Sequence, residues 1–147
     1  MHGTSYGLVQ YNVVYDVDGA GFVSEDGTET DNKFIHNFAV RIQGGRVDGT
    51  VKPSTTDPDL QDYGKGGTGF WFRTTGNVVR DNVAANASES GFTYNAAYLT
   101  SFNAPDYPGA MRFAADQSTL LTKLSPGVHA GNEVYGYGQH GVVVAFG

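Results

Sequence analysis

Three places in this chain carry the same spaced pattern, an Asn followed ten residues later by an apolar residue that comes directly after Gly. A fourth Asn, Asn37, lies in a stretch of similar character (Phe34-Ile35-His36-Asn37-Phe38-Ala39), and Gly69-Phe70 follows it after a longer interval. Recurrence of this kind is typical of repeat architectures, in which each repeat forms one structural unit. The three patterns are Asn12 to Gly21-Phe22, Asn82 to Gly91-Phe92 and Asn132 to Gly141-Val142.

The intervals between the Asn residues indicate how long each repeat is. Asn37 follows Asn12 by 25 residues, Asn82 follows Asn37 by 45, and Asn132 follows Asn82 by 50. A coil of about 25 residues fits the first interval, and the other two then each contain an inserted loop of roughly one further repeat. The insertions fall near 44–67 and 96–131, which are polar or rich in Pro. We therefore predict a single domain over 1–147 with two insertions.

The segments between the insertions favour short β-strands. Runs such as Val13-Val14-Tyr15, Phe70-Trp71-Phe72 and Val142-Val143-Val144 are β-branched or aromatic and are bounded by Gly and Asn. Ala114 to Leu124 is the one helical candidate. Like segments recur at coil distance rather than across two-residue turns, so we expect parallel stacking.

These patterns predict an all-β fold, a right-handed parallel β-helix of about four short coils with two long inserted loops. Coils would stack about 4.8 Å apart, so that equivalent side chains form ladders. Asn would suit the turns because it tolerates the left-handed conformation and because its amide can bond to neighbouring coils. An ordinary β-sandwich with coincidental spacing is the alternative. The expected ladders are Asn12, Asn37, Asn82 and Asn132, and Phe22, Phe70, Phe92 and Val142.

Composition excludes several classes of partner. A chain of 147 residues is one domain by size, and it has no Cys for disulfides or thiolate metal sites. Its net charge is −6, from 9 basic and 15 acidic residues, whereas nucleic acids and anionic membranes require a basic surface. No apolar run approaches the ~20 residues of a membrane span, and Met1 does not open a signal peptide. We expect neither a nucleic-acid nor a membrane partner.

Several of these residues resemble a known family. The most specific stretch is Tyr15-Asp16-Val17, Phe22 and Glu25-Asp26-Gly27, supported by His2-Gly3-Thr4, Glu29, Gly69-Phe70-Trp71-Phe72 and Asn77. It resembles the β-helix region of proteins related to fibrocystin and to the cell-migration-inducing, hyaluronan-binding proteins, over roughly 2–95 and again from Asn132. The resemblance implies a right-handed, pectin-lyase-like parallel β-helix and a role with polysaccharides such as hyaluronan. It also favours a secreted or cell-surface location.

An acidic cluster between Asp16 and Asp31 offers candidate catalytic groups. Glycoside hydrolysis needs paired carboxylates, and a polysaccharide lyase can use a carboxylate with Ca²⁺. If the protein is an enzyme, we expect one of these two classes. Glu25-Asp26-Gly27 is also an ordinary turn sequence, and His36 could be an exposed turn residue. The catalytic candidates are Glu25, Glu29 and Asp26, with His36 as a general base.

The first insertion contains a possible metal site. Asp57, Asp59 and Asp62 lie close together in the sequence and could hold calcium, which prefers several oxygen ligands. No cofactor is otherwise indicated. Arg73 and Arg80 could meet the carboxylate of a uronic acid through a bidentate fork, or could form exposed salt bridges with the abundant acids.

Aromatic residues gather near the insertions. Sugar rings stack on flat aromatic faces, so a groove walled by the two insertions is the predicted ligand site. Trp71 alternates with Phe70 and Phe72 and should point away from the core, which requires a cover. The rings could instead hold the loops against the body of the β-helix. The ligand candidates are Trp71, Tyr63, Tyr94, Tyr98 and Arg73.

Two functions fit these observations. The first is a carbohydrate-associated β-helix that binds or cleaves a polysaccharide beside the inserted loops. The second is a non-catalytic structural module that forms homo-oligomers through open solenoid ends, because neither end carries an evident cap and exposed strand edges leave N–H and C=O groups unpaired.

Overall fold

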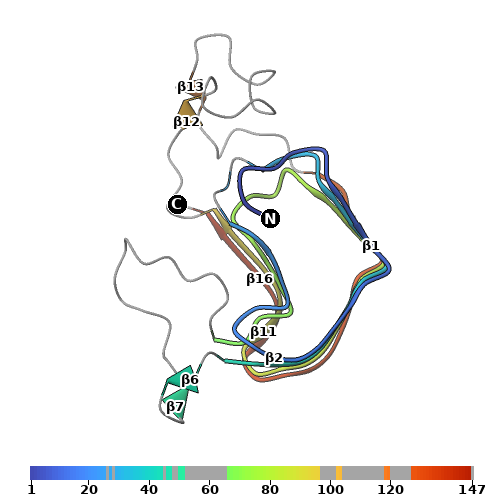
Figure 1. Ribbon diagram of the computed structural model, residues 1–147, viewed down its shortest axis with the longest axis vertical. Coiled ribbons are helices and arrows are strands. Elements are labelled where there is room, and N and C mark those ends of the chain that lie inside the picture. The colour runs from blue at the N-terminus through green and yellow to red at the C-terminus, as the bar shows by residue number, and fades with distance from the viewer. Residues whose placement is uncertain are drawn as a thin grey trace.

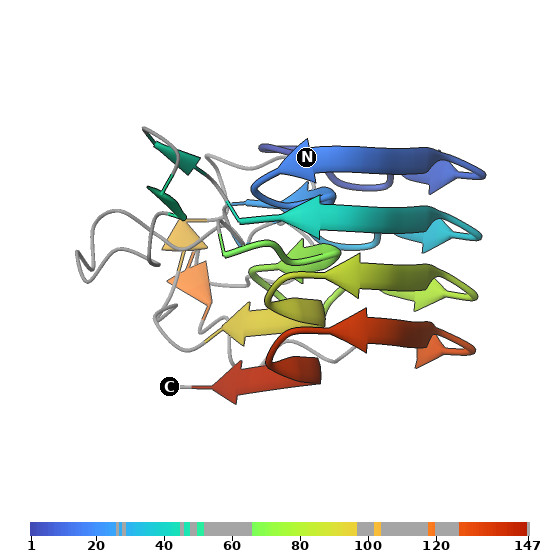
Figure 2. The same cartoon turned by 90° about the horizontal axis from the view of Figure 1, so that it is seen from below.

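The computed structural model describes residues 1–25, 27, 29–44, 46–47, 50–51, 66–96, 102–103, 118–119 and 127–146. Within these ranges every regular element is a β-strand, and twelve strands form three parallel sheets of four. The chain passes once through each sheet per coil and winds as a right-handed solenoid (Figures 1 and 2). The predicted right-handed parallel β-helix is therefore confirmed.

The four coils each contribute one strand to each sheet. Coil 1 contains β1 (Leu8–Gln10), β2 (Val13–Asp18) and β3 (Phe22–Ser24). Coil 2 contains β4 (Lys33–Ile35), β5 (Phe38–Gln43) and β8 (Phe70–Phe72). Coil 3 contains β9 (Val78–Arg80), β10 (Val83–Ala87) and β11 (Ser90–Ala96). Coil 4 contains β14 (His129–Ala130), β15 (Glu133–Tyr137) and β16 (His140–Phe146).

The remaining strands lie between the coil strands in sequence. The first excursion leaves after β5 and returns before β8, and β6 (Arg46–Val47) pairs antiparallel with β7 (Thr50–Val51) within it. The second leaves after β11 and returns before β14, and it contains the antiparallel pair β12 (Phe102–Asn103) and β13 (Ser118–Thr119). The helix predicted over Ala114 to Leu124 is wrong at Ser118–Thr119, which form strand β13, and the rest of that range lies outside the described residues. Strand β14 also lies inside the range 96–131, so the coil resumes earlier than that boundary.

A single serine forms hydrogen bonds with both described ends of the first insertion, the segment called the first excursion above. The Ser88 hydroxyl accepts a hydrogen bond from the Gly44 amide at 2.8 Å and donates one to the Gly66 carbonyl at 2.7 Å. Ser88 belongs to the turn between β10 and β11 in coil 3, next to Glu89, whose carboxylate accepts from the Thr68 hydroxyl at 3.1 Å. The excursion thus begins and ends at one anchored position.

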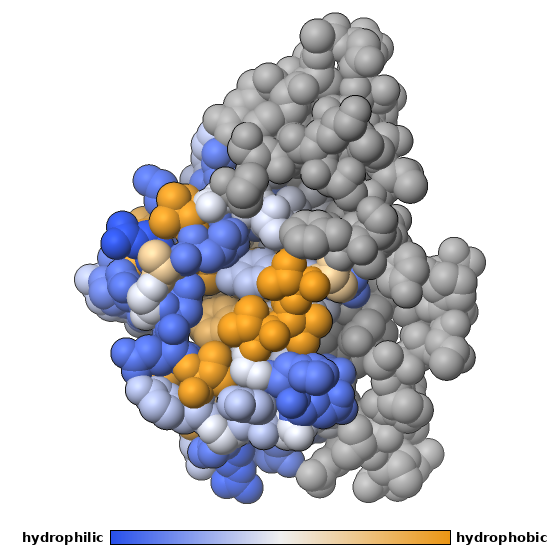
Figure 3. Space-filling view, turned by 180° about the vertical axis from the view of Figure 1, so that it is seen from behind, coloured by the Kyte–Doolittle hydropathy of each residue, from blue (hydrophilic) through white to orange (hydrophobic). Residues whose placement is uncertain are grey.

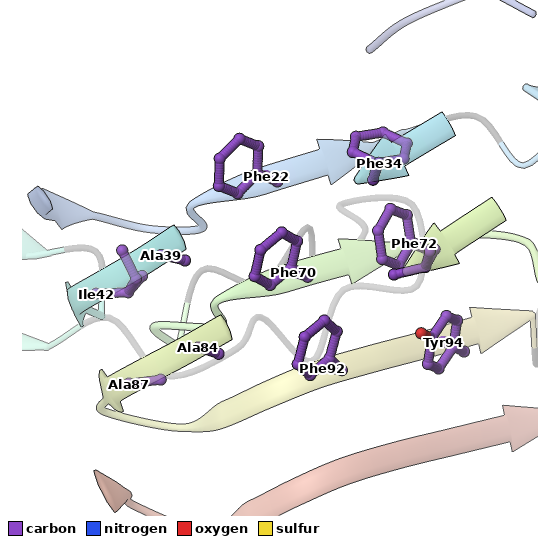
Figure 4. Packing of buried hydrophobic residues seen from close by; sticks show 11 residues of the cluster. Phe22, Phe34, Ala39, Ile42, Phe70, Phe72, Ala84, Ala87, Phe92 and Tyr94 are labelled. Atoms are coloured by element: carbon purple, nitrogen blue, oxygen red, sulfur yellow. The ribbon is translucent and has the colours of Figure 1, made fainter. Parts of the chain in front are cut away.

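The core consists of side chains stacked in register from coil to coil. Phe22, Phe70 and Phe92 stack face to face with ring centroids 4.7 Å apart at both steps, and Val142 is the next residue in register (Figure 4). Stacking of aromatic rings contributes stability in addition to that from burying their apolar surface. A second row places Tyr94 against Phe72 at 5.5 Å. The predicted aromatic ladder is confirmed.

The asparagine ladder is equally regular. Asn12 donates through its backbone and side-chain amides to Oδ1 of Asn37, at 3.1 and 3.0 Å. Asn37 does the same to Asn82, and Asn82 to Asn132, over distances of 2.9 to 3.1 Å. We call this edge, between the first and second sheets, the asparagine corner. The predicted ladder is confirmed, and its hydrogen bonds replace the backbone pairs that a turn forfeits.

The left-handed backbone at the asparagine corner belongs to the residue before each Asn. Tyr11, His36 and Asp81 have φ of 55°, 52° and 53°, and Gly131 has 67°. The Asn residues themselves have no positive φ. Our reason for placing Asn in these turns was therefore half wrong, because the amide's reach to the next coil, not tolerance of the left-handed region, selects it.

A second Asn position, not foreseen from the sequence, lies at the other end of the first sheet. Asn32 donates through its backbone amide to Oδ1 of Asn77 at 3.1 Å, and Gly7 donates to Oδ1 of Asn32 at 2.7 Å. Strand β4 therefore has an Asn at each end, Asn32 and Asn37, and both are buried.

The glycine of each Gly-aromatic pair is required by close approach rather than by its backbone angles. A Cβ on Gly21 would lie 2.6 Å from the Gly69 carbonyl oxygen, and one on Gly69 would lie 2.7 Å from that of Gly91. A Cβ on Gly91 would lie 2.8 Å from that of Gly141. Gly141 faces nothing nearer than 3.5 Å. The repeating Gly thus marks where the backbone of one coil lies in close contact with a carbonyl oxygen of the next coil.

No helix in the described part of the chain is long and apolar enough to cross a membrane.

Candidate functional site

Glu29, predicted as a catalytic carboxylate, is buried and bound to backbone. Its side chain is 1% exposed. Oε1 accepts from the Gly3 amide at 3.1 Å, and Oε2 accepts from the Gly27 amide at 2.9 Å and the Ser24 hydroxyl at 3.4 Å. A carboxylate that accepts several N–H groups fixes the segments that supply them. Here it ties the start of the chain to the turn between β3 and β4.

Glu25, the second predicted carboxylate, lies at the surface of the same turn. Its Oε2 is 3.4 Å from Nδ1 of His2, and both side chains are exposed. Its backbone amide donates to the Met1 carbonyl at 3.1 Å. Glu25 is therefore accessible to a ligand, whereas Glu29 is not.

His36 lies at the asparagine corner, on the far side of β4 from these carboxylates. The three residues of β4 alone span about 10 Å, so His36 cannot share a proton with Glu25 or Glu29. Its imidazole stacks on the Tyr11 ring, with centroids 5.2 Å apart and planes 1° from parallel. The structure thus separates the catalytic candidates into two places.

Tyr94, predicted to bind ligand, faces the core. It is 7% exposed, and burial raises the pKa of its hydroxyl well above the ordinary value. The hydroxyl is 3.0 Å from Nδ1 of His129, whose Nε2 is 2.9 Å from the Thr75 carbonyl. A carbonyl can only accept, so Nε2 carries a proton and Nδ1 of the neutral ring accepts from Tyr94. The sequence analysis did not propose His129 as a site residue, because nothing in its sequence neighbours indicates this contact.

The ligand candidates Trp71 and Arg73 are also buried. Trp71 lies in β8, and Arg73 directly follows that strand. Trp71 is 1% exposed and lies outside the hydrophobic core cluster, as expected for a residue that alternates with Phe70 and Phe72. Its indole is therefore not open as a stacking surface. The Arg73 amide donates to the Ser24 carbonyl at 3.0 Å.

The other predicted site residues lie outside the described residues. These are Asp26, the ligand candidates Tyr63 and Tyr98, and the calcium candidates Asp57, Asp59 and Asp62. Among the residues that are described, no group of three His, Asp or Glu side chains could hold a metal ion.

The exposed groups suited to a ligand lie instead at the asparagine corner and on the outer faces of the two sheets that meet there. Tyr11 is 72% exposed, and Tyr15 and Phe38 are exposed on the outer face of the second sheet. On the outer face of the first sheet, Lys33 and Arg80 are exposed cations, and within the described chain neither forms an ion pair. We call these five residues, together with His36, the corner surface.

The corner surface is held rigidly from beneath. Strand register places Lys33 beside Val78 and Arg80 beside Ile35, so the two cations come from adjacent coils. Tyr11 and His36 occupy equivalent turn positions in coils 1 and 2, each directly before a ladder Asn. Side chains on regular, hydrogen-bonded strands are more precisely positioned than side chains on loops. The strands therefore fix the backbone that carries the two exposed cations, and stacking orients the rings of Tyr11 and His36.

One further cluster borders the second sheet beyond the corner. Arg41 lies 3.2 Å from Asp16 and 3.5 Å from the Tyr15 hydroxyl. The hydrogen bond to Tyr15, and then the charge of Asp16, raise the pKa of Arg41. Because Asp16 already engages Arg41, this cation is less available to a ligand than Lys33 or Arg80.

Sequence reasoning missed most of the corner surface because it searched for aromatics near the insertions. The signal that could have found it is the alternation within each strand. Once Val14 and Phe34 are assigned to the core, Tyr15 and Lys33 must point outward. Arg80 was noted as a cation that could meet a uronic acid, but its neighbours were not.

Comparison with known proteins supports the fold and its family. Residues 1–142 match the family model described as the CEMIP β-helix. Fibrocystin-L of Mus musculus and fibrocystin-L of Homo sapiens are each 27% identical over 144 residues, which is 97% of this chain and 3% of theirs. The chain therefore spans only a small part of these relatives. No solved structure matches. Because the family model covers almost the whole sequence, this chain belongs to the CEMIP β-helix family.

Proposed function

We propose that this β-helix binds a polysaccharide that carries carboxylate groups, and that the ligand lies along the corner surface. The observation that carries the proposal is the combination of exposed aromatic rings at the asparagine corner and exposed cations on the adjoining first sheet, which form no ion pair with any described residue. The resemblance to hyaluronan-binding proteins points to the same class of ligand.

The aromatic side chains supply the stacking surface. The exposed Tyr11 ring already stacks on His36, which holds it in one orientation. Sugar rings present C–H groups that pack on such flat apolar faces. A ring that is fixed before binding loses less conformational entropy when the ligand arrives, and this strengthens binding.

The cations supply the preference for acidic sugars. Lys33 and Arg80 are exposed within a chain whose net charge is −6, so their positive charge is local. An Arg can hold a carboxylate with two parallel hydrogen bonds, whereas a Lys acts as a point charge. Contacts of this exposed kind weaken as salt concentration rises.

Binding is better supported than cleavage. Glycoside hydrolysis requires two carboxylates on either side of the scissile bond, about 5–10 Å apart. Of the two described candidates, Glu29 is buried against backbone amides and only Glu25 is accessible. Glu29 therefore has the role of a structural acceptor.

A groove beside the inserted loops is the competing location for the same ligand. It would use Tyr63 and Tyr98, which lie outside the described residues, and so it stays a prediction from the sequence. The two locations can be separated experimentally because their residues do not overlap.

The test measures binding of hyaluronan oligosaccharides, polygalacturonate and a neutral glucan by calorimetry at low and moderate salt. The test variants are Lys33→Ala with Arg80→Ala, and Tyr11→Ala. The matched controls are Tyr137→Ala, an exposed Tyr on coil 4, and the pair Tyr63→Ala with Tyr98→Ala. We expect the double cation variant to weaken binding of the acidic polymers roughly tenfold or more and to remove most of its salt dependence.

Three results would overturn the proposal in different ways. No binding to any polymer removes it altogether. Loss of binding only in the Tyr63 and Tyr98 pair places the ligand in the groove beside the loops. Release of reducing ends or unsaturated products that stops in Glu25→Gln would show that the domain cleaves the polymer.

A further inference from the structure

His36 is the residue of the corner surface whose charge changes near neutral pH. It lies in the turn between β4 and β5 and is exposed. Histidine is the side chain that ordinarily gains or loses a proton between about pH 5 and pH 8. Lysine and arginine stay charged and tyrosine stays neutral over this range. The net charge of the corner surface therefore depends on the protonation state of His36.

The position of His36 allows it to take up a proton without disturbing the core. Seen along the solenoid axis, hydrophilic residues lie along most of the described rim, and hydrophobic residues gather in the middle (Figure 3). His36 belongs to the rim because it is exposed, whereas the next residue, Asn37, is buried in the asparagine ladder. An exposed imidazole gains its charge in contact with water, so protonation carries no cost of burying a charge.

The turns of three successive coils supply the groups that face His36. On the side of coil 1, its imidazole stacks on the Tyr11 ring, with centroids 5.2 Å apart. On the side of coil 3, its backbone amide donates to the Arg80 carbonyl at 3.1 Å, and Asp81 occupies the equivalent turn position. Lys33 begins the same strand, β4, that leads into this turn. The charged neighbours of His36 are therefore two cations and one carboxylate.

Protonation of His36 changes the balance among these charges. With a neutral imidazole, Asp81 offsets one of the two positive charges of Lys33 and Arg80. An imidazolium restores the second positive charge, while Asp81 is engaged from both sides. The imidazolium also stays on the face of Tyr11, because a cation is attracted to the face of an aromatic ring. Positive charge is thus added without loss of the stack that orients Tyr11.

We propose that the corner surface binds acidic polysaccharide more tightly as the pH falls from about 7.5 to about 5.5, because His36 becomes its third cation. This inference rests on the proposed function, since it concerns the regulation of the same site. The ligand itself does not change over this range, because an ordinary carboxyl group has a pKa below 5 and stays ionised. The change in affinity therefore originates in the protein.

The coupling between proton and ligand is reciprocal. A proton that strengthens binding of the polymer must itself be held more firmly when the polymer is bound. Binding near the middle of the pH range is therefore accompanied by proton uptake. Calorimetry in two buffers of different ionisation enthalpy measures this uptake directly, and a neutral glucan should cause none.

Two substitutions fix the charge of His36 in opposite states. His36→Tyr keeps an aromatic ring at this left-handed position, as Tyr11 does in the equivalent turn of coil 1, but does not titrate near neutral pH. His36→Arg carries a permanent charge on a planar group that can stack on Tyr11. His140→Gln is the matched control, because His140 is an exposed histidine on β16 of coil 4. Circular dichroism and thermal unfolding check that each variant folds.

The test compares binding of hyaluronan oligosaccharides, polygalacturonate and a neutral glucan to the full chain in low salt, at about pH 5.5 and about pH 7.5. We expect wild type and His140→Gln to bind the acidic polymers about three- to tenfold more tightly at the lower pH, as one added surface charge allows. His36→Tyr should bind them equally at the two pH values and take up no proton. His36→Arg should bind them equally at the two pH values and more tightly than His36→Tyr.

The possible failures separate this inference from the proposed function. Wild-type binding that is equally tight at both pH values, or a pH dependence that persists in His36→Tyr, overturns the role of His36 and leaves polysaccharide binding intact. A similar gain for the neutral glucan would also overturn it, because added charge cannot act on a neutral polymer. Absence of binding to every polymer at both pH values removes the proposed function and this inference with it.

Discussion

Asn37 lies directly above Asn82, and the two are joined by hydrogen bonds from both amides of Asn37 to a single oxygen of Asn82, at 2.9 and 3.0 Å. They are 45 residues apart in sequence, and both are buried. The contact therefore fixes the register of coils 2 and 3 across the whole first excursion. It also shows why Asn recurs, since its side-chain amide accepts hydrogen bonds from the preceding coil and donates one to the following coil.

Replacement of Asn82 by Ala should be among the most damaging changes in the chain. It removes the acceptor for Asn37 and the donor to the Phe34 carbonyl, at a site without access to water. Leaving such groups unpaired should lower the free energy of unfolding by about 3 kcal/mol in urea denaturation. Asn12→Ala, at the exposed end of the ladder, is the matched control and should cost about 1 kcal/mol or less. Equal losses at the two positions would contradict the role assigned to burial.

Gly69→Ala should destabilise the fold although its backbone angles suit alanine. The new methyl group would lie 2.7 Å from the Gly91 carbonyl oxygen and 2.8 Å from Cβ of Ala84. Forcing two coils apart should cost at least about 2 kcal/mol, as measured by thermal or urea unfolding. Gly141→Ala carries the same chemical change at the open end and should stay within about 0.5 kcal/mol of wild type.

The two candidate carboxylates should respond oppositely to alanine. Glu29→Ala leaves the Gly3 and Gly27 amides without their acceptor, and we expect a loss of about 3 kcal/mol in stability. Glu25→Ala removes only an exposed contact with His2 and should change stability by about 0.5 kcal/mol or less. If Glu29→Ala unfolds at wild-type denaturant concentrations, the carboxylate is not a structural acceptor and its catalytic role must be reconsidered.

Tyr94 should make stability sensitive to alkaline pH. Burial raises its pKa in the folded state above the ordinary value of 10.0, so the unfolded chain loses this proton first. The contribution is complete below pH 10 and decreases as the pH rises above that value. Tyr94→Phe should cost about 1 kcal/mol at neutral pH, through the lost bond to His129, and should flatten the alkaline decline. The exposed control Tyr137→Phe should leave the profile of unfolding free energy against pH unchanged.

The architecture could be predicted because its repeating elements are visible as spacing. The Asn ladder and the row of Phe22, Phe70 and Phe92 follow from the requirement that equivalent positions stack. Asn32 and Asn77 were not recognised as a ladder because their equivalents in coils 1 and 4, Gly7 and Gly127, break the pattern. A ladder that begins and ends in glycine leaves too few members to stand out in one sequence.

The site could be predicted less well because exposure depends on which face a strand turns outward. Tyr94 and Trp71 appeared suited to a ligand by composition alone, yet both are buried. Lys33 is exposed because its strand neighbour Phe34 occupies the core, and Tyr11 is exposed because it lies on the turn at the asparagine corner. Neither position can be assigned from spacing until the register of the strands is known. Glu29 was selected for its charge, whereas its surroundings of backbone amides decide its role.

The two hydrogen bonds that Ser88 forms with Gly44 and Gly66 have a consequence for how the first insertion can vary. Both stems of the first excursion converge on one hydroxyl group, while the excursion itself departs from a point away from the asparagine corner. A peptide of different length or composition could be grafted between those two ends without altering the asparagine ladder. The fold thus separates the four stacked coils, which would stay the same, from an inserted segment that can be exchanged.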